Sequence, residues 1–321
     1  MAYSLRELKR DLATRDTPVQ RWIDGTLWQW RNRRKRAAAT PDATDLRVVF
    51  AIPLISKAGA SDWATVQDNL RATLITLCNQ TDSRWQAVIC GQDRPDVVDM
   101  DARITFLPFP DRPEGFDKRP KTLMLRRHIA EDLGGAGYYF ALDADDLLHP
   151  GLVAHILTDN NQAGYQIDRG YMLDHATLAL ATLQPPDAAY PAASHFYRSC
   201  GSSSAIYFDF GSGADYAAVL AARGNHRKVV RNMAYLGLAM AFIPFPAGIY
   251  VMNHGDNLRQ KRGKMSGKMK HFNENPVRDP VEIARIAQDF AFAELFPRRW
   301  PPDNAKSSGA TPAPESAGHP R

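Results

Sequence analysis

The feature that most constrains the fold of this chain is an apolar run that does not alternate with polar residues. Residues 46–55 read LRVVFAIPLI and contain several β-branched side chains. Because successive side chains of a strand point to opposite faces, such a run is typical of a parallel strand covered on both faces. Residues 63–77 predict a covering helix, since their apolar side chains recur three to four positions apart. An α/β fold is therefore expected.

The same succession of elements continues along the chain. Strands are predicted at residues 85–90 and 103–108, a helix at 121–132 is followed by a Gly-Gly pair, and another strand ends at Leu142. The order is β-α-β-β-α-β, with connections long enough for parallel pairing. We therefore expect an open sheet flanked by helices.

Four segments differ in composition. Residues 1–45 form a basic, helical extension, residues 46–157 carry the regular pattern, and residues 158–298 form a less regular half that ends in a predicted helix at 280–296. Residues 299–321 are rich in Pro, Ser, Gly and Ala, which bury too little apolar surface to order a chain. This last segment is expected to be a disordered tail.

The strand that ends at Leu142 is followed by crowded carboxylates. Residues 138–150 read YYFALDADDLLHP and place Asp143, Asp145 and Asp146 within four positions. Ligands of open α/β sheets bind beyond the carboxyl ends of strands, and three neighbouring carboxylates repel one another unless a cation neutralises them. Mg²⁺ or Mn²⁺ accepts carboxylate and phosphate oxygens together. The motif thus predicts a metal-bound diphosphate, the alternative being a polar turn in which Asp146 caps the next helix.

These motifs together resemble a known family. VVFAIPLI, TLITLCNQTDSRW, QAVICGQD and GAGYYFALDADDLLHPG follow one another in the order and spacing of family 2 glycosyltransferases. Residues 46–157 are similar to the nucleotide-sugar-binding half of these GT-A-fold enzymes. The resemblance implies metal-assisted transfer of a sugar, with inversion, from a nucleotide-sugar donor to a glycan or lipid-linked acceptor. It also implies a UDP-sugar as the donor, Mn²⁺ or Mg²⁺ as the cofactor, and an acceptor-binding role for residues 158–298.

Individual positions take their expected roles from the same resemblance. Residues at the exit of the first strand would lie along the nucleoside, a carboxylate after the second strand would bind the base, and two basic side chains would approach the base or diphosphate: Pro53, Ile55, Asp93, Lys121 and Arg127. The sequence CGQD stands where the family often has DDGS, which leaves the base open. For the two basic residues, solvated helix charges are the alternative.

The metal and the catalytic base are assigned in the same way. Asp143 would face the ribose or metal, Asp145 would bind the metal directly, and His254 would return to it from late in the chain, unless it lies in a surface turn. The family's usual Glu-Asp pair is missing, so the candidates for the base are Asp215 and His226, the latter because histidine accepts protons near neutral pH. Residues 201–204, GSSS, resemble a loop near the donor sugar or form a plain turn.

Two other functions remain open at this point. One is a GT-A-like protein that binds a nucleotide-sugar without turnover, suggested by the missing Glu-Asp pair. The other is a DxD phosphatase with Asp143 as nucleophile, although such motifs normally lie near the start of their domain.

The balance of charge favours an anionic partner. The chain has 40 Lys and Arg against 35 Asp and Glu, a formal charge of +5. These residues form no recognisable nucleic-acid module, so nucleic acid is not expected. Without a signal-peptide core, a transmembrane-length apolar stretch or a disulfide-like cysteine pattern, a cytoplasmic location is expected. Tryptophans beside the basic run at 31–36 favour either a solvated extension or peripheral contact with the inner face of an anionic membrane.

Overall fold

This computed structural model describes residues 18–38, 45–110, 117–252 and 266–300. Its larger sheet has seven strands in the order β10-β6-β9-β4-β1-β2-β3. β1, β2, β3 and β4 are parallel, whereas β9 runs antiparallel to both β4 and β6. The strands are β1 Arg47–Pro53, β2 Trp85–Gly91, β3 Ile104–Pro108, β4 Ala136–Ala141, β6 Tyr165–Gln166, β9 Ser204–Asp209 and β10 Ala241–Phe242. The expected α/β class is confirmed, with a mixed, mostly parallel sheet.

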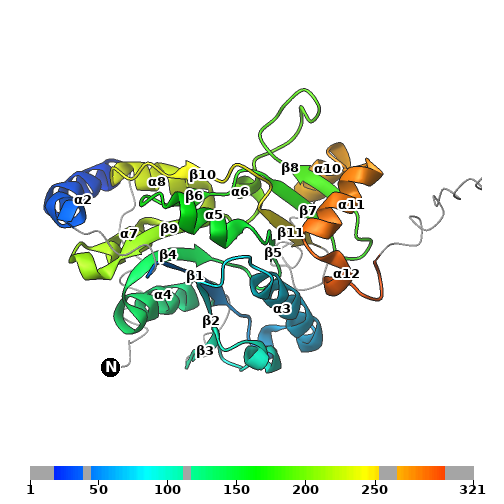
Figure 1. The fold of residues 1–321 in the computed structure, drawn as a ribbon, viewed down its shortest axis with the longest axis horizontal. Helices are drawn as coiled ribbons and strands as arrows, with labels where there is room; N and C mark the ends of the chain where they lie inside the picture. Colours follow the sequence, from blue (N-terminus) through cyan, green and yellow to red (C-terminus); the bar gives the residue numbers. More distant parts are fainter. Residues whose placement is uncertain (1–17, 39–44, 111–116, 253–265, 301–321) are drawn as a thin grey trace, which may run out of the picture.

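Helices cover both faces of this sheet. α4 and α5 both contact β1, and Figure 1 shows them on opposite sides of it, which explains why residues 48–52 are all buried. α2 packs on α8 at one end of the molecule, and α10 to α12 lie at the other end (Figure 1). The helices of this part of the fold are α2 Pro18–Ala38, α3 Trp63–Cys78, α4 Lys118–His128, α5 Leu152–Asp159, α6 Phe196–Ser199, α7 Tyr216–Ala222 and α8 Val229–Tyr235.

A second sheet of four strands, in the order β5-β11-β7-β8, lies beside the first. A smaller apolar core separates it from its helices. Its elements are β5 Leu147–Leu148, β7 Gly170–Asp174, β8 Leu180–Leu183, β11 Gly248–Met252, α10 Ser266–Glu274, α11 Pro280–Asp289 and α12 Phe292–Leu295. The chain crosses directly from the large sheet to the small one at residues 142–146, from β4 to β5, at residues 167–169, from β6 to β7, and at residues 243–247, from β10 to β11.

Two helices differ from their predictions. The helix predicted at 121–132 begins at Lys118, three residues earlier, and ends in a π-turn, Ile129–Leu133, before Gly134 takes a positive φ of 57°. The helix predicted at 280–296 is two helices, because Ala291 adopts a left-handed conformation (φ 53°) between the buried Phe290 and Phe292. In both places tertiary burial outweighs the local periodicity.

None of the helices within the described ranges has both the length and the apolar content needed to cross a bilayer.

Candidate active site

The three aspartates lie at the point where the order of the large sheet reverses. The chain builds outward from β1 to β2 and β3, then returns through α4 to place β4 on the other side of β1. In open α/β sheets the crevice beyond the carboxyl ends of two such strands is the usual ligand site. Residues 143–146 follow β4 directly, and Pro53 ends β1. The fold therefore positions the acidic turn at the switch point.

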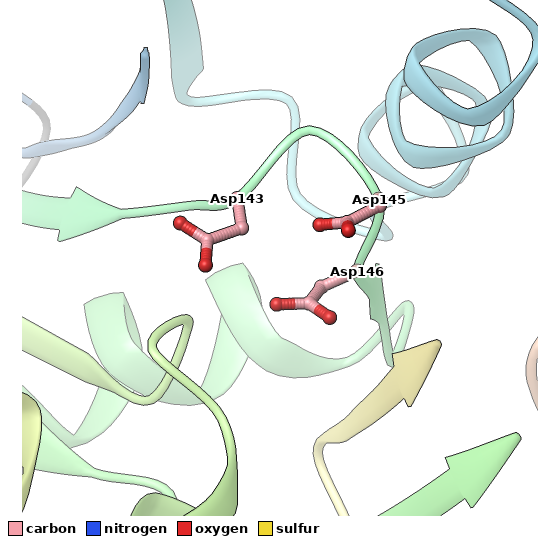
Figure 2. A group of neighbouring side chains, drawn as sticks. All are labelled: Asp143, Asp145 and Asp146. Atoms are coloured by element: carbon pink, nitrogen blue, oxygen red, sulfur yellow. The ribbon is translucent and has the colours of Figure 1, made fainter. Parts of the chain in front are cut away.

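The carboxylates of this turn are close enough to share one cation. Oxygen atoms of Asp143, Asp145 and Asp146 lie within 4.8 Å of one another. Figure 2 shows the three side chains on one side of the turn, with those of Asp145 and Asp146 directed toward the side on which Asp143 lies. Asp146 is buried, and the other two are partly exposed. Among the described residues this is the one His, Cys, Asp and Glu cluster with such geometry.

A lysine that the sequence did not single out pairs with the first aspartate. Lys118 Nζ lies 2.5 Å from Asp143 Oδ1, and both side chains remain partly exposed. Burial raises the pKa of Asp143, but the ammonium charge of Lys118 more than offsets this, and the pKa is lowered overall. The pKa of Lys118 is lowered by burial and raised further by Asp143, ending above its usual value. The turn thus has one fixed positive charge at its edge.

Asp146 is held from the loop that precedes β9. Ser202 Oγ donates to its Oδ2 at 2.6 Å, and the Cys200 thiol lies 3.1 Å from the same oxygen. Ser202 Oγ also accepts from the backbone N–H of Asp143 at 2.8 Å. Burial, followed by repulsion from Asp145 and Asp143, raises the pKa of Asp146 well above its usual range. The predicted helix cap is not what this side chain does.

The donor set fits a hard divalent cation. Asp146 is 1% exposed, and its Oδ1 is a buried oxygen without a hydrogen-bond partner. Buried polar atoms are normally satisfied, and a cation bound here would pair with this oxygen and relieve the repulsion among the three carboxylates. All three donors are carboxylate oxygens, which Mg²⁺ and Mn²⁺ prefer. The residues present are therefore suited to either ion.

The NQT and HPG motifs hold the turn in place together. Gln80 Nε2 donates to the carbonyl of His149 at 2.9 Å, and Gln80 Oε1 accepts from the N–H of Val153 at 3.0 Å. Thr81 donates its N–H to the carbonyl of Pro150. Helix α3 is thereby fastened to the segment just after the acidic turn. This explains physically why two motifs some 70 positions apart occur together.

The exit of β1 forms a second polar corner beside the turn. Lys121 is 1% exposed, donates to the carbonyl of Leu54 at 2.5 Å, and pairs with Asp117 at 2.6 Å. Asp93 Oδ2 accepts from the N–H of Lys57 at 2.7 Å, which ties the loop after β2 to the loop after β1. Pro53 and Ile55 flank Leu54 and are partly exposed. Lys121 is therefore not a solvated helix charge.

Arg127 is placed elsewhere on the same helix. It pairs with Glu131 at 2.8 Å, one turn later. Lys118, at the start of α4, contacts the acidic turn, and nine residues of helix correspond to about 13 Å. The structure brings Lys118 and Lys121, but not Arg127, to the switch point.

His254 lies outside the described residues. The strand before it, β11, runs antiparallel to β5, so its end at Met252 is on the side of the acidic turn.

The two candidate bases lie near opposite ends of the strands of the large sheet. β9 begins beside the acidic turn and ends at Asp209, which pairs with Ala136 at the start of β4. Asp215 follows that far end; its side chain caps α7 through the N–H of Ala218, and its carbonyl accepts from Trp28. The structure does not bring Asp215 to the acidic turn.

Helix α7 runs back toward the turn and returns His226. Its Nδ1 lies 2.6 Å from the carbonyl of Tyr197, and the cationic Arg223 helps to lower the pKa of Asp143. Burial lowers the pKa of His226 to about 4, with a further lowering by Arg223. The ring is thus neutral near pH 7, with Nδ1 protonated and donating to the carbonyl.

Sequence reasoning missed several side chains at the site. They are Lys118, Arg223 and the pair of Asp168 and His195, whereas Ser202 belongs to the GSSS loop that the sequence did single out. For Lys118 a signal existed, because Asp117-Lys118 precedes the predicted helix at a proper distance for its first turn. The others depend on pairing between distant segments, which a single sequence does not display.

Comparison with known proteins gives only distant likenesses. A scan against protein-family models and a search of curated proteins found no match. Among solved structures, S. aureus TarS matches over 81% of this chain and 45% of its own, with 8% identity and a TM-score of 0.40. The glycosyltransferase GlyE of Streptococcus pneumoniae TIGR4 matches over 78% and 64%, with 10% identity and a TM-score of 0.35. This chain spans less than half the length of TarS.

A third solved structure is described as a synthase and not as a glycosyltransferase. 4-Diphosphocytidyl-2C-methyl-D-erythritol synthase matches over 70% of this chain and 98% of its own, with 12% identity and a TM-score of 0.37. At these TM-scores none of the likenesses decides a function. The functional assignment therefore depends on the chemistry of the acidic turn and its surroundings.

Proposed function

We propose that this protein is a metal-assisted glycosyltransferase of the GT-A type, which transfers a sugar from a nucleotide-sugar to a glycan or lipid-linked acceptor. The observation that carries the proposal is the acidic turn at the switch point, with three carboxylates within 4.8 Å and a buried, unpartnered oxygen on Asp146. A nucleoside diphosphate is the anion that such a cation site accepts at the end of an open sheet. The donor taken as most probable from the resemblance is a UDP-sugar.

The residues of the turn have separable roles in this proposal. Asp145 and Asp143 would hold Mg²⁺ or Mn²⁺, with Asp146 as the inner carboxylate. A bound divalent ion stabilises negative charge on a leaving diphosphate. Lys118, already paired with Asp143, lies where its ammonium can also bind a phosphate oxygen. Lys121 and Asp117 fix the β1 exit, along which Pro53, Ile55 and Asp93 would contact the nucleoside.

Calorimetric titration tests this assignment. UDP, UDP-glucose and GDP-mannose are titrated separately into the protein with Mn²⁺ present and after chelation. At least one is expected to bind only with Mn²⁺. Asp145→Asn should abolish this binding, whereas Asp132→Asn, on the solvated end of α4, should not. Failure of all three to bind with Mn²⁺ would overturn the proposal, and metal-dependent hydrolysis of p-nitrophenyl phosphate instead would favour the phosphatase.

A second partner, an anionic bilayer, is proposed for helix α2. Its inner side packs on the domain through the buried Trp28 and Asn32, while Ile23, Leu27 and Trp30 face outward at positions i, i+4 and i+7. Trp30 is 81% exposed, an unusual state for a tryptophan unless it meets another surface. Exposed basic residues surround this apolar stripe: Arg31, Arg33, Arg34 and Lys35.

The composition of this face favours lipid over a second protein copy. The arginines also line a hollow of about 850 Å³ beside the helix. Two such basic faces would repel one another, whereas anionic headgroups attract each cation and the interface accepts tryptophan. A lipid-linked acceptor would then be reached at the bilayer surface.

Vesicle sedimentation tests the bilayer contact. Vesicles containing phosphatidylglycerol should bind the protein, with weakening at high salt, and pure phosphatidylcholine should not. Trp30→Ser should reduce binding by about tenfold, while Val281→Ser, equally exposed at the other end of the molecule, should leave it unchanged. The lipid assignment would be contradicted if the protein did not bind the vesicles and instead formed dimers in solution that Trp30→Ser abolishes.

A further inference from the structure

A histidine and an aspartate form a close pair on the acceptor side of the molecule. His195 Nδ1 lies 2.5 Å from Asp168 Oδ1. The side chains are 27% and 16% exposed, so the pair is shielded yet reachable from solvent. A carboxylate at Nδ1 keeps the proton on that nitrogen and leaves the lone pair on Nε2. This is the arrangement of a histidine prepared to accept a proton.

The sheet register places this pair at the level of the acidic turn. Phe140 of β4 pairs with Ala205 of β9, which pairs with Tyr165 of β6. When the register is continued three residues past Phe140 and Tyr165, it aligns Asp143, Ser202 and Asp168. Two hydrogen bonds support the extension, from the N–H of Asp143 to Ser202 Oγ and from the N–H of Ile167 to the carbonyl of Ser203.

The span between the two groups suits one sugar ring. Two strand spacings separate the backbones of Asp143 and Asp168, about 10 Å in all. In glycoside hydrolysis with inversion, the groups that act on opposite faces of the sugar carbon stand about 6.5–9.5 Å apart. A sugar held at the acidic turn would therefore lie between the metal-binding carboxylates and the imidazole that Asp168 positions.

The position of His195 is determined by close packing. Phe196, the next residue, is fully buried, and its N–H donates to the carbonyl of Asp168 at 2.9 Å. Its ring lies against two glycines: a Cβ added to Gly170 would be 2.6 Å from the ring, and one added to Gly248 would be 2.9 Å from it. Because no larger residue fits at either glycine, the ring and hence His195 are held beside Asp168.

We infer that His195 is the catalytic base of the proposed transfer and that Asp168 is the residue that positions it. The inference rests on the proposed function. His195 Nε2 takes the proton of the acceptor hydroxyl as the acceptor oxygen bonds to the anomeric carbon. The bond from that carbon to the diphosphate oxygen breaks, and its electron pair leaves with the nucleoside diphosphate. The imidazolium formed is stabilised by the carboxylate of Asp168.

His226, the base named from the sequence, is less suited to this role. A neutral carbonyl, that of Tyr197, faces its Nδ1, and the cationic Arg223 and Arg227 act on the ring. Positive neighbours oppose the imidazolium that proton transfer would create, whereas Asp168 favours it at His195. Both histidines lie beside the short helix α6, and they differ in the Nδ1 partner and in the charges around the ring.

Nucleotide release from the donor tests the inference without knowledge of the acceptor, because water can replace it. UDP-glucose, UDP-galactose and GDP-mannose are incubated with the protein and Mn²⁺. His195→Gln should lower release at least about 100-fold, with Mn²⁺-dependent UDP binding unchanged. His128→Gln is the matched control, since His128 and Asp132 form the same kind of pair on the surface of α4. Imidazole added to His195→Ala should restore part of the release.

A second readout does not depend on turnover. In ¹⁵N spectra of the histidine rings, His195 should be the Nδ1–H tautomer, and Asp168→Asn should change this because an amide can also donate. Mn²⁺ should broaden the His195 signals strongly and those of His128 weakly. Release that persists in His195→Gln, no release by a protein that still binds Mn²⁺ and UDP, or unbroadened His195 signals would each overturn the inference. Loss of UDP binding in the wild type would instead overturn the proposed function.

Discussion

Two of the three direct crossings from the large sheet to the small one carry aspartates, and these two differ in how they are built. Between β4 and β5 three aspartates lie in one turn, and their shared space is formed by consecutive residues. Between β6 and β7 a single aspartate, Asp168, gains its partner His195 from 27 positions further along the chain. The first crossing concentrates negative charge for a cation, and the second combines a carboxylate with an imidazole ring. The two crossings therefore place chemically different groups at the junction of the two sheets.

The largest expected effect is a difference in UDP affinity between a variant of the first crossing and a variant of the second. Asp145→Asn should weaken Mn²⁺-dependent UDP binding at least about 100-fold, because a neutral amide replaces a charged metal ligand. Asp168→Asn should change the same affinity by less than about threefold. Calorimetry on both variants measures this. Equal losses would mean that the two crossings form one binding site.

The attachment of the acidic turn to α3 should have the next largest effect. Gln80→Leu removes both hydrogen bonds to the segment after the turn and leaves the N–H of Val153 buried without an acceptor. The free energy of unfolding should fall by about 2–4 kcal/mol, as measured by urea denaturation. Asn79→Leu, at an exposed contact with Glu294, should cost less than about 1 kcal/mol. A reversed order would refute the role given to the NQT motif.

Ser202 holds the acidic turn from the loop that precedes β9. Its hydroxyl donates to Asp146 and accepts from the N–H of Asp143. Ser202→Ala should destabilise the protein by about 2 kcal/mol, since a buried carboxylate loses a donor. Thr26→Ala, an exposed hydroxyl on α2, should have an effect below about 0.5 kcal/mol. Equal stability of the two variants would show that Ser202 does not hold the turn.

The last effect is a dependence of stability on pH from His226. Its pKa is about 4 in the folded protein and about 6.5 when unfolded. Because the unfolded chain takes up the proton first, the contribution is complete above about pH 6.5 and is lost as pH falls toward 4, by at most about 3 kcal/mol before solvent screening. His226→Gln should flatten the stability curve in this window. An unchanged curve would show that the ring is not buried as described.

The difference between the crossings also explains what could be predicted from the sequence. The strands before Leu142 are continuous apolar runs, so β1 to β4 and the acidic turn were predicted close to their observed bounds. Lys121 and Asp93 lie at the predicted strand exits, but Lys118 was missed because the start of α4 follows tertiary contacts. The pair of Asp168 and His195 follows from the packing of Phe196 beside Asp168, a long-range contact without a periodic signal. Local sequence patterns therefore identified only the crossing from β4 to β5.

The central claim is that the acidic turn and a nucleoside diphosphate share one divalent ion. Electron paramagnetic resonance of Mn²⁺ measures its affinity for the protein with and without UDP. Because binding linkage is reciprocal, a shared ion must be bound more tightly when UDP is present. We predict at least a tenfold increase in Mn²⁺ affinity with UDP, and none in Asp145→Asn. The same Mn²⁺ affinity with and without UDP in the wild type would contradict the claim.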